Sequence, residues 1–469
     1  MPATRAEIPA PGRVRRVLLA LLALVIVAAA GITAVVLIDR NSGDDRSAAA
    51  ALPDPVLPDL GVPDPVLADD LGDEPVPEPA VLAATLAPTL ADPRLGGRLL
   101  ARVVDVSDGE ILFDSAGDQP AIPASNAKLV TAFAALSTLD PGERLETRVV
   151  AGPMAGQIVL IGGGDVTLSR TAPSLSYPEA ASIGDLAAQV LDNIGVPITG
   201  IVVDGSLYTG PAISPLWGTG DAPSTYAAPI TAVMVDGGRT TPTSRSRSAT
   251  PDLDAGTALA AALGLPNLPV TTGVATPEAA TLGEVTSAPV SRLVETMLEL
   301  SDNVLAESIA RQVALARGQS PDFPGSAAAV TDAVAAAGLD VTGMHLVDGS
   351  GLSTQNAVSP RVLTDVLAAV AAQDADPSLS AIASGLPVAG YDGTLVDRYE
   401  GGRAVGAGSV RAKSGTLAGV NALSGYVVTA EGRVLAFALI ADQLPPGPLI
   451  GAEPVLDAVA GVLASCGCR

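Results

Sequence analysis

The amino-acid sequence predicts an α+β fold that is interrupted by a β-rich insertion. Segments of strand-like composition lie at both ends of the folded region, and segments with helical periodicity lie between them. From about residue 145 to 285 the pattern changes to short apolar runs broken by glycine and proline, such as "QIVLIGGGDVTLS". Hydrophobic residues make up 48% of the 469 residues, which is ample for a core.

The first 85 residues predict a membrane anchor followed by a spacer. Residues 17–38 are 22 residues without a charge, enough to span a hydrocarbon core of about 30 Å as a helix. Arginines precede this segment, so residues 1–16 are expected in the cytoplasm and the bulk of the chain outside it. A cleaved signal peptide is the alternative, although its apolar core is normally about 7–15 residues long. Residues 39–85 are rich in proline and aspartate and predict an extended linker.

Residues 86–144 predict a hairpin and a helix, the first part of the folded domain. Two apolar runs flank Asp108-Gly109, a dipeptide typical of hairpin turns. The stretch "PASNAKLVTAF" then predicts a helix whose first turn carries Ser125 and Lys128. Positions i and i+3 share one face of a helix, so the hydroxyl and the amine can point into one pocket.

The insertion, residues 145–285, is expected to contain few helices, and it includes a polar loop, "DGGRTTPTSRSRSATPDLDAG". Helical periodicity returns in the second part of the folded domain, residues 286–469, where "SDN" separates two helical segments. Three strands follow, with a turn at Glu431-Gly432 between the last two, and "PVLDAVAGVLAS" predicts a closing helix.

Charge, histidine and cysteine content exclude several classes of function. A net charge of −24 is repelled by phosphate backbones, so no nucleic-acid partner is expected. His345 is the single histidine and is interpreted as a structural residue, so serine chemistry would need another base. Cys466 and Cys468 are the two cysteines; a bridge across one residue would be strained, so free thiols in a frayed tail are predicted, with intermolecular pairing as the alternative. The absence of a Cys/His cluster argues against a structural zinc site.

Lys128 and Lys413 are the only lysines, because the other 24 basic residues are arginines. A lysine can take the proton of a serine hydroxyl if burial or nearby positive charge lowers its pKa from about 10.4 toward 7. Arginine cannot, since its pKa stays above about 12. This difference gives a chemical reason for a lysine three residues after Ser125.

Lys413 opens "KSGT" on a predicted strand, where its cation could hold a substrate carboxylate or tune Lys128. The amide of Thr416 could join that of Ser125 in an oxyanion hole. In "SDN", Ser301 could relay a proton to a leaving amine, and the same tripeptide is also typical of a helix N-cap.

The order Ser-x-x-Lys, Ser-x-Asn, Lys-[Ser/Thr]-Gly resembles the penicillin-recognising serine DD-peptidases over roughly residues 86–469. It is most similar to the low-molecular-mass class C type, the D-alanyl-D-alanine carboxypeptidase/endopeptidases. This resemblance implies their DD-peptidase/β-lactamase-like transpeptidase domain, an antiparallel sheet flanked by helices. "IGGGDVTLS" and "DGSGLS" support this subclass. Ser414 stands where threonine is commonest in the family and keeps the hydroxyl. The insertion is short for a family in which two inserted domains are usual, so how it divides into domains stays open.

The resemblance implies that Ser125 attacks the carbonyl of a terminal D-Ala-D-Ala bond and that Lys128 takes its proton. The amides of Ser125 and Thr416 would hold the oxyanion. Ser301 and Lys413 would help deliver a proton to the leaving D-alanine.

Substrate binding is assigned by the same resemblance. Asn303 would orient the peptide, and Lys413, Ser414 and Thr416 would bind its carboxylate. The implied partners are peptidoglycan peptides ending in D-Ala-D-Ala and β-lactam antibiotics that acylate Ser125, with no metal or organic cofactor. A β-lactamase or esterase on the same scaffold is one alternative, against which the long insertion and "DGSGLS" argue. A non-catalytic peptidoglycan-binding homologue is the other.

Overall fold

A computed structural model of the protein describes residues 74–468 apart from 373, 400–404 and 446–450. The predicted anchor, residues 17–38, lies outside the described residues, as does most of the predicted linker. In the part of the chain that is described, no helix has both the length and the apolar character needed to cross a bilayer.

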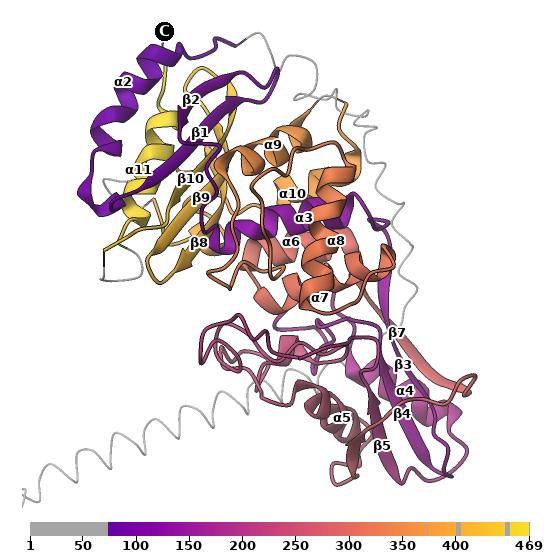
Figure 1. Ribbon diagram of the computed structural model, residues 1–469. Helices are drawn as coiled ribbons and strands as arrows, with labels where there is room; N and C mark the ends of the chain where they lie inside the picture. The colour runs from indigo at the N-terminus through magenta and orange to yellow at the C-terminus, as the bar shows by residue number, and fades with distance from the viewer. Residues whose placement is uncertain (1–73, 373, 400–404, 446–450, 469) are drawn as a thin grey trace, which may run out of the picture. The chain divides into compact units, whose positions relative to one another are not determined.

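The first sheet confirms that strands from both ends of the folded region pair with one another. Its order is β2-β1-β10-β9-β8, and all four pairings are antiparallel. The strands are β1 (Leu99–Asp105), β2 (Ile111–Ser115), β8 (Val410–Leu417), β9 (Val420–Val428) and β10 (Val434–Ala441). Figure 1 shows the indigo β1 beside the yellow β10, which brings the N-terminal hairpin against the C-terminal strands.

Alternation along β10 explains why this sheet has helices on both faces. Leu435, Phe437 and Leu439 point into a core shared with α2 (Pro79–Leu90) and α11 (Glu453–Ala464). Ala436 and Ala438 point to the opposite core, under the central helices (Figure 1). Successive side chains of a strand point to opposite faces, so an uninterrupted apolar run is what a strand covered on both sides requires.

Helix α2 begins at Pro79, inside the predicted linker, so that prediction is wrong for residues 79–85. Proline is well tolerated in the first helical turn, because its missing N–H needs no partner there. Leu82 and Leu86 are 0% and 1% exposed, which places the helix in the core of the domain.

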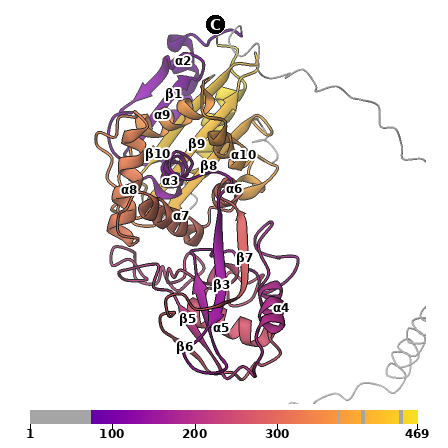
Figure 2. The same ribbon diagram turned by 90° about the vertical axis from the view of Figure 1, so that its right-hand side faces the viewer.

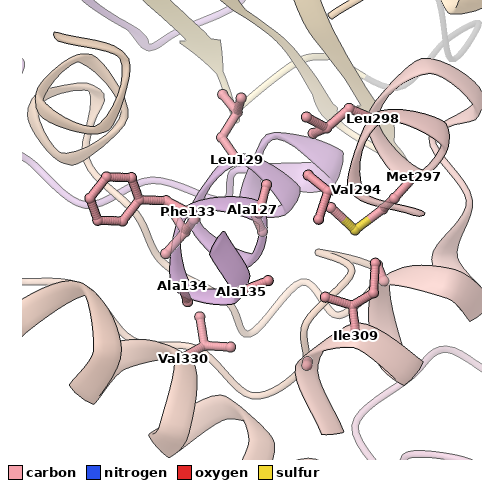
Figure 3. Close-up of a cluster of buried hydrophobic side chains, with 14 of the residues drawn as sticks. Ala127, Leu129, Phe133, Ala134, Ala135, Val294, Met297, Leu298, Ile309 and Val330 are labelled. Carbon is pink, nitrogen blue, oxygen red and sulfur yellow. The ribbon is translucent and has the colours of Figure 1, made fainter. Parts of the chain in front are cut away.

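The central helix α3 (Ala127–Leu136) is buried at every position. Figure 3 shows its alanine-rich surface packed against Val294 and Met297 of α6 and against Ile309 of α7. Small side chains let the neighbouring helices approach closely, which is how a core with few aromatic residues is filled. The surrounding helices are α6 (Val290–Leu300), α7 (Asn303–Ala316), α8 (Phe323–Ala336), α9 (Pro360–Ala371) and α10 (Ser380–Gly385).

The insertion forms a second, mixed sheet of order β6-β5-β4-β3-β7. Strand β3 pairs antiparallel with β4 and with β7, which lies beside it in Figure 2, whereas β4, β5 and β6 are parallel neighbours. The parallel connections run through two helices, one between β4 and β5 and one between β5 and β6. Its elements are β3 (Arg144–Ala151), β4 (Gln157–Gly162), α4 (Ile183–Asn193), β5 (Gly200–Asp204), α5 (Pro251–Ala262), β6 (Val270–Thr272) and β7 (Thr281–Pro289).

The C-terminal cysteines are paired, which corrects the prediction of free thiols in a frayed tail. Cys466 and Cys468 form a disulfide and are 4% and 7% exposed. The carbonyl of Cys468 accepts a hydrogen bond of 2.7 Å from the amide of Glu78. The segment before α2 therefore holds this tail in the core, a long-range contact that local sequence does not reveal.

Candidate active site

Ser125 lies in a short 3₁₀ turn, η2 (Ala124–Asn126), that leads directly into α3. Ala124 has a φ of 47°, a left-handed conformation that is uncommon for alanine. Two glycines pack closely against this turn: a Cβ on Gly351 would collide with the carbonyl of Ala124, and one on Gly415 would lie 3.0 Å from the carbonyl oxygen of Pro123. Gly351 of "DGSGLS" and Gly415 of "KSGT" thus leave room for the backbone that presents Ser125.

Lys128 is fully buried, and its Nζ lies 3.0 Å from the Oγ of Ser125. The same ammonium group donates to Asn303 Oδ1 at 2.6 Å and to the carbonyl of Ser350 at 2.7 Å. Burial lowers the pKa of Lys128 to about 8, although nearby carboxylates, Asp348 first among them, act in the opposite direction. A lysine with this pKa and this contact meets the geometric and acid–base requirements of a base for a serine hydroxyl.

The loop "DGSGLS" is held by two buried carboxylates. Glu307 accepts the amides of Gly349 at 3.1 Å and of Ser350 at 2.9 Å, and so fixes the carbonyl that Lys128 contacts. Asp348 accepts the amides of Gly351 and Ser353 at 2.8 and 2.7 Å. Burial raises the pKa of Glu307 to about 7, and Asp348 adds to that effect. Sequence reasoning missed Glu307, because only its helical position on α7 brings it under this loop.

The tripeptide "SDN" acts both as a helix cap and as part of the site. Ser301 ends α6 in a left-handed conformation, with φ 54° and ψ 36°. The side chain of Asp302 accepts the amide of Val304 and caps α7. Asn303 is the first residue of α7, and besides contacting Lys128 its Nδ2 donates to the carbonyl of Tyr226 at 3.2 Å.

Lys413 is buried on β8 and donates to the carbonyl of Ser414 at 2.9 Å. Burial lowers its pKa well below the ordinary value, and the positive charges of Lys128 and Arg398 act in the same direction.

The two hydroxyl residues that follow have partners that the motifs did not predict. Ser414 Oγ lies 2.7 Å from Thr394 Oγ1. Thr416 donates to Glu453 Oε1 at 2.6 Å, across from the start of α11. Thr394 and Glu453 were missed because only the packing of the chain brings them to β8.

These residues surround one cavity of about 490 Å³. Both lysines lie behind the cavity wall, so a substrate would meet the side chains that line the cavity before it met either amine. Five of the predicted site residues line this cavity: Ser125, Ser301, Asn303, Ser414 and Thr416. It is also lined by Asp221, Tyr226, Gly351, Leu352, Thr394, Arg398, Leu417, Ala418 and Glu453.

His345 lies apart from this constellation. Its side chain is exposed and borders a different, largely apolar cavity beside Phe323, while its backbone pairs with Ala357. The position of His345 is therefore fixed by its backbone pairing and not by packing of its imidazole ring. Among the described residues, the basic side chain within hydrogen-bond distance of the Ser125 hydroxyl is that of Lys128.

Comparison with known proteins identifies relatives over most of the chain. The profile of the D-Ala-D-Ala carboxypeptidase 3 (S13) family matches residues 82–249 and 240–449. A protein named carboxypeptidase DacB, from Mycolicibacterium smegmatis, is 42% identical over 460 residues, covering 96% of each chain. A D-alanyl-D-alanine carboxypeptidase from an Actinomadura species is 29% identical, covering 90% of this chain and 91% of the relative.

Solved structures show the same fold. The crystal structure of penicillin binding protein 4 from Haemophilus influenzae superposes with a TM-score of 0.65 at 21% identity, covering 81% of this chain and 98% of the other. The same Haemophilus protein complexed with a β-lactam gives a TM-score of 0.61 over the same shares, at 20% identity.

Proposed function

The chain belongs to the D-Ala-D-Ala carboxypeptidase 3 (S13) family of serine carboxypeptidases, and from this premise we propose how its residues carry out the reaction. The observation that carries the proposal is the 3.0 Å contact between Lys128 Nζ and Ser125 Oγ beside an open cavity. Neutral Lys128 takes the Ser125 proton as Oγ attacks the carbonyl of the penultimate D-alanine. The amides of Ser125 and Thr416 stabilise the resulting oxyanion.

Collapse of this intermediate breaks the C–N bond and leaves an ester on Ser125. The leaving D-alanine needs a proton on its nitrogen, and Ser301, assisted by Lys413, supplies that proton. Lys128 is protonated at this stage and restores the proton that Ser301 gives up. A water molecule then attacks the ester and releases the shortened peptide.

Substrate binding is assigned to the residues on the wall of the same cavity. Ser414 and Thr416 offer hydroxyls to the terminal carboxylate. Lys413 is buried behind them on β8 and becomes the cationic partner of the carboxylate when it binds, because a nearby negative charge raises the pKa of a lysine. Asn303 holds the peptide backbone through its amide while its Oδ1 orients Lys128. The proposed substrate is a peptidoglycan stem peptide that ends in D-Ala-D-Ala.

β-Lactams are proposed to acylate Ser125 through the same steps. A β-lactam places its amide carbonyl where the scissile bond lies, but its leaving group stays attached. Deacylation is then slow, because the tethered group hinders the water. This behaviour separates a carboxypeptidase from a β-lactamase, which hydrolyses the ester quickly.

The place of action follows from the N-terminal sequence. We propose that residues 17–38 anchor the chain in the cell membrane with the catalytic domain outside the cytoplasm, where its substrate lies. Fractionation of cells that express the full chain, with and without residues 1–38, tests this. Recovery of the full chain in the soluble fraction at its unprocessed mass would rule the anchor out.

A fluorescent penicillin provides the direct test of the mechanism. We expect the full-length protein to form a covalent adduct that survives denaturation, and Ser125→Ala to form none. Release of D-alanine from a pentapeptide ending in D-Ala-D-Ala is then measured on the same two proteins. A folded wild type that neither labels nor releases D-alanine would overturn the proposal.

A further inference from the structure

The carboxylate of Asp302, in the middle of "SDN", has two separate sets of partners. Its Oδ1 accepts the amides of Val304 at 2.9 Å and Leu305 at 3.3 Å, which caps α7. Its Oδ2 is turned away from α7, and the residue is only 4% exposed. A buried carboxylate oxygen needs partners of its own, because its desolvation is costly.

Those partners all come from the insertion. Arg247 Nη2 donates to Asp302 Oδ2 at 2.9 Å, Arg239 Nη2 at 3.2 Å and the hydroxyl of Tyr177 at 2.8 Å. Arg239 also donates to the Tyr177 hydroxyl at 2.7 Å, and its guanidinium lies 5.0 Å from the centre of that ring. The two arginines belong to the polar loop "DGGRTTPTSRSRSATPDLDAG". We call Tyr177, Arg239 and Arg247 the arginine clamp.

The clamp is itself held by the backbone of the insertion. Arg247 Nη1 donates to the carbonyl of Gly237, in the 3₁₀ turn η3 (Asp236–Gly238). Asp236 is buried and pairs with Arg170 at 2.8 Å, and Arg170 also donates to the carbonyl of Arg239 at 3.0 Å. The guanidinium of Arg247 and the backbone of Arg239 are therefore held in place by contacts within the insertion.

Two arginines against one carboxylate determine its charge state. Burial alone would raise the pKa of Asp302, but Arg247 and then Arg239 outweigh it and hold the pKa well below its usual range. Asp302 therefore stays ionised, and an ionised carboxylate is the stronger acceptor for the helix amides.

The residues on either side of Asp302 both line the active-site cavity. Ser301 has a φ of 54°, which an L-residue adopts only when its surroundings impose it. Asn303 Oδ1 accepts from Lys128 Nζ at 2.6 Å. Asp302 stands between them and is fixed on both of its oxygens, so it sets where both side chains lie.

We propose that Arg247 and Arg239 are positioning residues for the acylation step, because they fix Asp302 and thereby place Ser301 and Asn303 around Lys128. The proposal rests on the roles given above to Ser301 and Asn303. The proposal gives the insertion a role in catalysis. Its polar loop contacts Asp302, although no residue of the loop lines the active-site cavity.

Arg247→Met in the full-length protein tests the proposal, with Arg245→Met as the matched control. Arg245 lies two residues away in the same loop and is exposed, and the arginines that pair with Asp302 are Arg239 and Arg247. We expect the rate constant for labelling by fluorescent penicillin to fall about 10- to 100-fold in Arg247→Met, since a displacement of about 1 Å near a reacting centre costs up to about 100-fold. Arg245→Met should stay within about twofold. Arg247→Lys should be intermediate, because lysine keeps the charge and loses the planar fork.

A double-mutant cycle with Asp302→Asn separates positioning from general loss of stability. If Arg247 acts through Asp302, Arg247→Met should change the labelling rate little in the Asp302→Asn background. Additive effects would overturn the proposal, as would a folded Arg247→Met that labels at the wild-type rate. If Arg247→Met melts below the assay temperature, Arg239→Met replaces it. This variant removes the longer of the two arginine contacts to Asp302, and the same outcomes support or overturn the proposal.

The pH dependence of labelling gives a second readout. Without Arg247 the charge of Asp302 is less compensated, so the pKa of Lys128 should rise and the labelling profile should move to higher pH. A variant that merely loosens the fold would lower the rate without moving the profile. The charged groups that act on Lys128 from the surrounding elements are Asp348, Glu307 and Asp302, and the neighbouring Lys413 has its own pKa lowered by the charge of Lys128. Labelling of wild type but not of Ser125→Ala shows that the proposed function holds whatever the clamp variants do.

Discussion

The hydroxyl of Thr416 is hydrogen-bonded to the carboxylate of Glu453 at 2.6 Å, inside the cavity that Ser125 lines. Thr416 is one of the residues proposed to receive the terminal carboxylate of the substrate. A second carboxylate at this point competes for the same hydroxyl and repels the incoming one. Arg398, which also lines the cavity, is already paired with Asp457, so it compensates the charge of Glu453 only in part.

Glu453→Gln should therefore accelerate acylation. Glutamine keeps an oxygen that can accept from Thr416 and removes the negative charge. Two unit charges about 4 Å apart interact by about 1 kcal/mol in water, so we expect the labelling rate constant with a carboxylate-bearing penicillin to rise about fivefold. A β-lactam with its carboxylate esterified serves as the control and should show little change. Equal acceleration with both compounds, or slower labelling with the free acid, would contradict this account.

Lys128→Arg should abolish acylation although it keeps a positive charge. Arginine stays protonated and cannot take the Ser125 proton, and removing a catalytic base of this kind costs about 10³-fold or more. The test is covalent labelling, together with a melting curve, because Lys128 is fully buried and arginine is larger. Lys128→Met, which fits the same space without a charge, is the companion variant. Labelling of folded Lys128→Arg at a rate near that of wild type would exclude Lys128 as the base.

The acylation rate should rise with pH and level off above about pH 8. Lys128 acts as a base only when neutral, and its pKa is lowered to about 8. Below that value the neutral fraction falls about tenfold per pH unit, and the rate should fall with it. Stopped-flow labelling from pH 6 to 10 measures this dependence. A rate that is flat across this range would mean that proton transfer to Lys128 does not limit acylation.

Glu307→Gln should shift that profile to lower pH. The charge of Glu307 raises the pKa of Lys128, so its removal lets Lys128 lose its proton more easily. Glu307 also holds the amides of Gly349 and Ser350, so the maximal rate is expected to fall as well. Labelling profiles of the variant and of wild type are compared for their midpoints, independently of their plateaus. A midpoint that stays in place would show that Glu307 acts only as a scaffold.

The site could be predicted further from the sequence than the fold could. A serine that is activated without a histidine can use a neutral lysine as its base, and the chain has two lysines, both within motifs. Because this chemistry allows few residue types, the residues that perform it can be recognised from short sequence motifs. Glu453 and Arg247 carry no such signal, because α11 and the polar loop reach the site only through tertiary packing.

The differences between the predicted and the observed fold also arise from tertiary packing. Short apolar runs in the insertion do not reveal whether strands are parallel, so the parallel order of β4, β5 and β6 could not be predicted. The sequence predicts a loose tail at Cys466 and Cys468, because nothing local shows that the backbone of Glu78 holds Cys468. Proline suggested a linker at residue 79, where it instead begins a helix.

The place of α2 within the domain leads to a prediction about stability. Leu82 is fully buried against the first sheet, whereas its neighbour Val81 is 38% exposed. Leu82→Ala should lower the free energy of unfolding by about 2–5 kcal/mol through lost burial and a residual cavity, and Val81→Ala by far less. Urea denaturation followed by tryptophan fluorescence measures both, since Trp217 is buried in the same chain. If residues 79–85 were only a linker, the two variants would unfold at the same urea concentration as wild type.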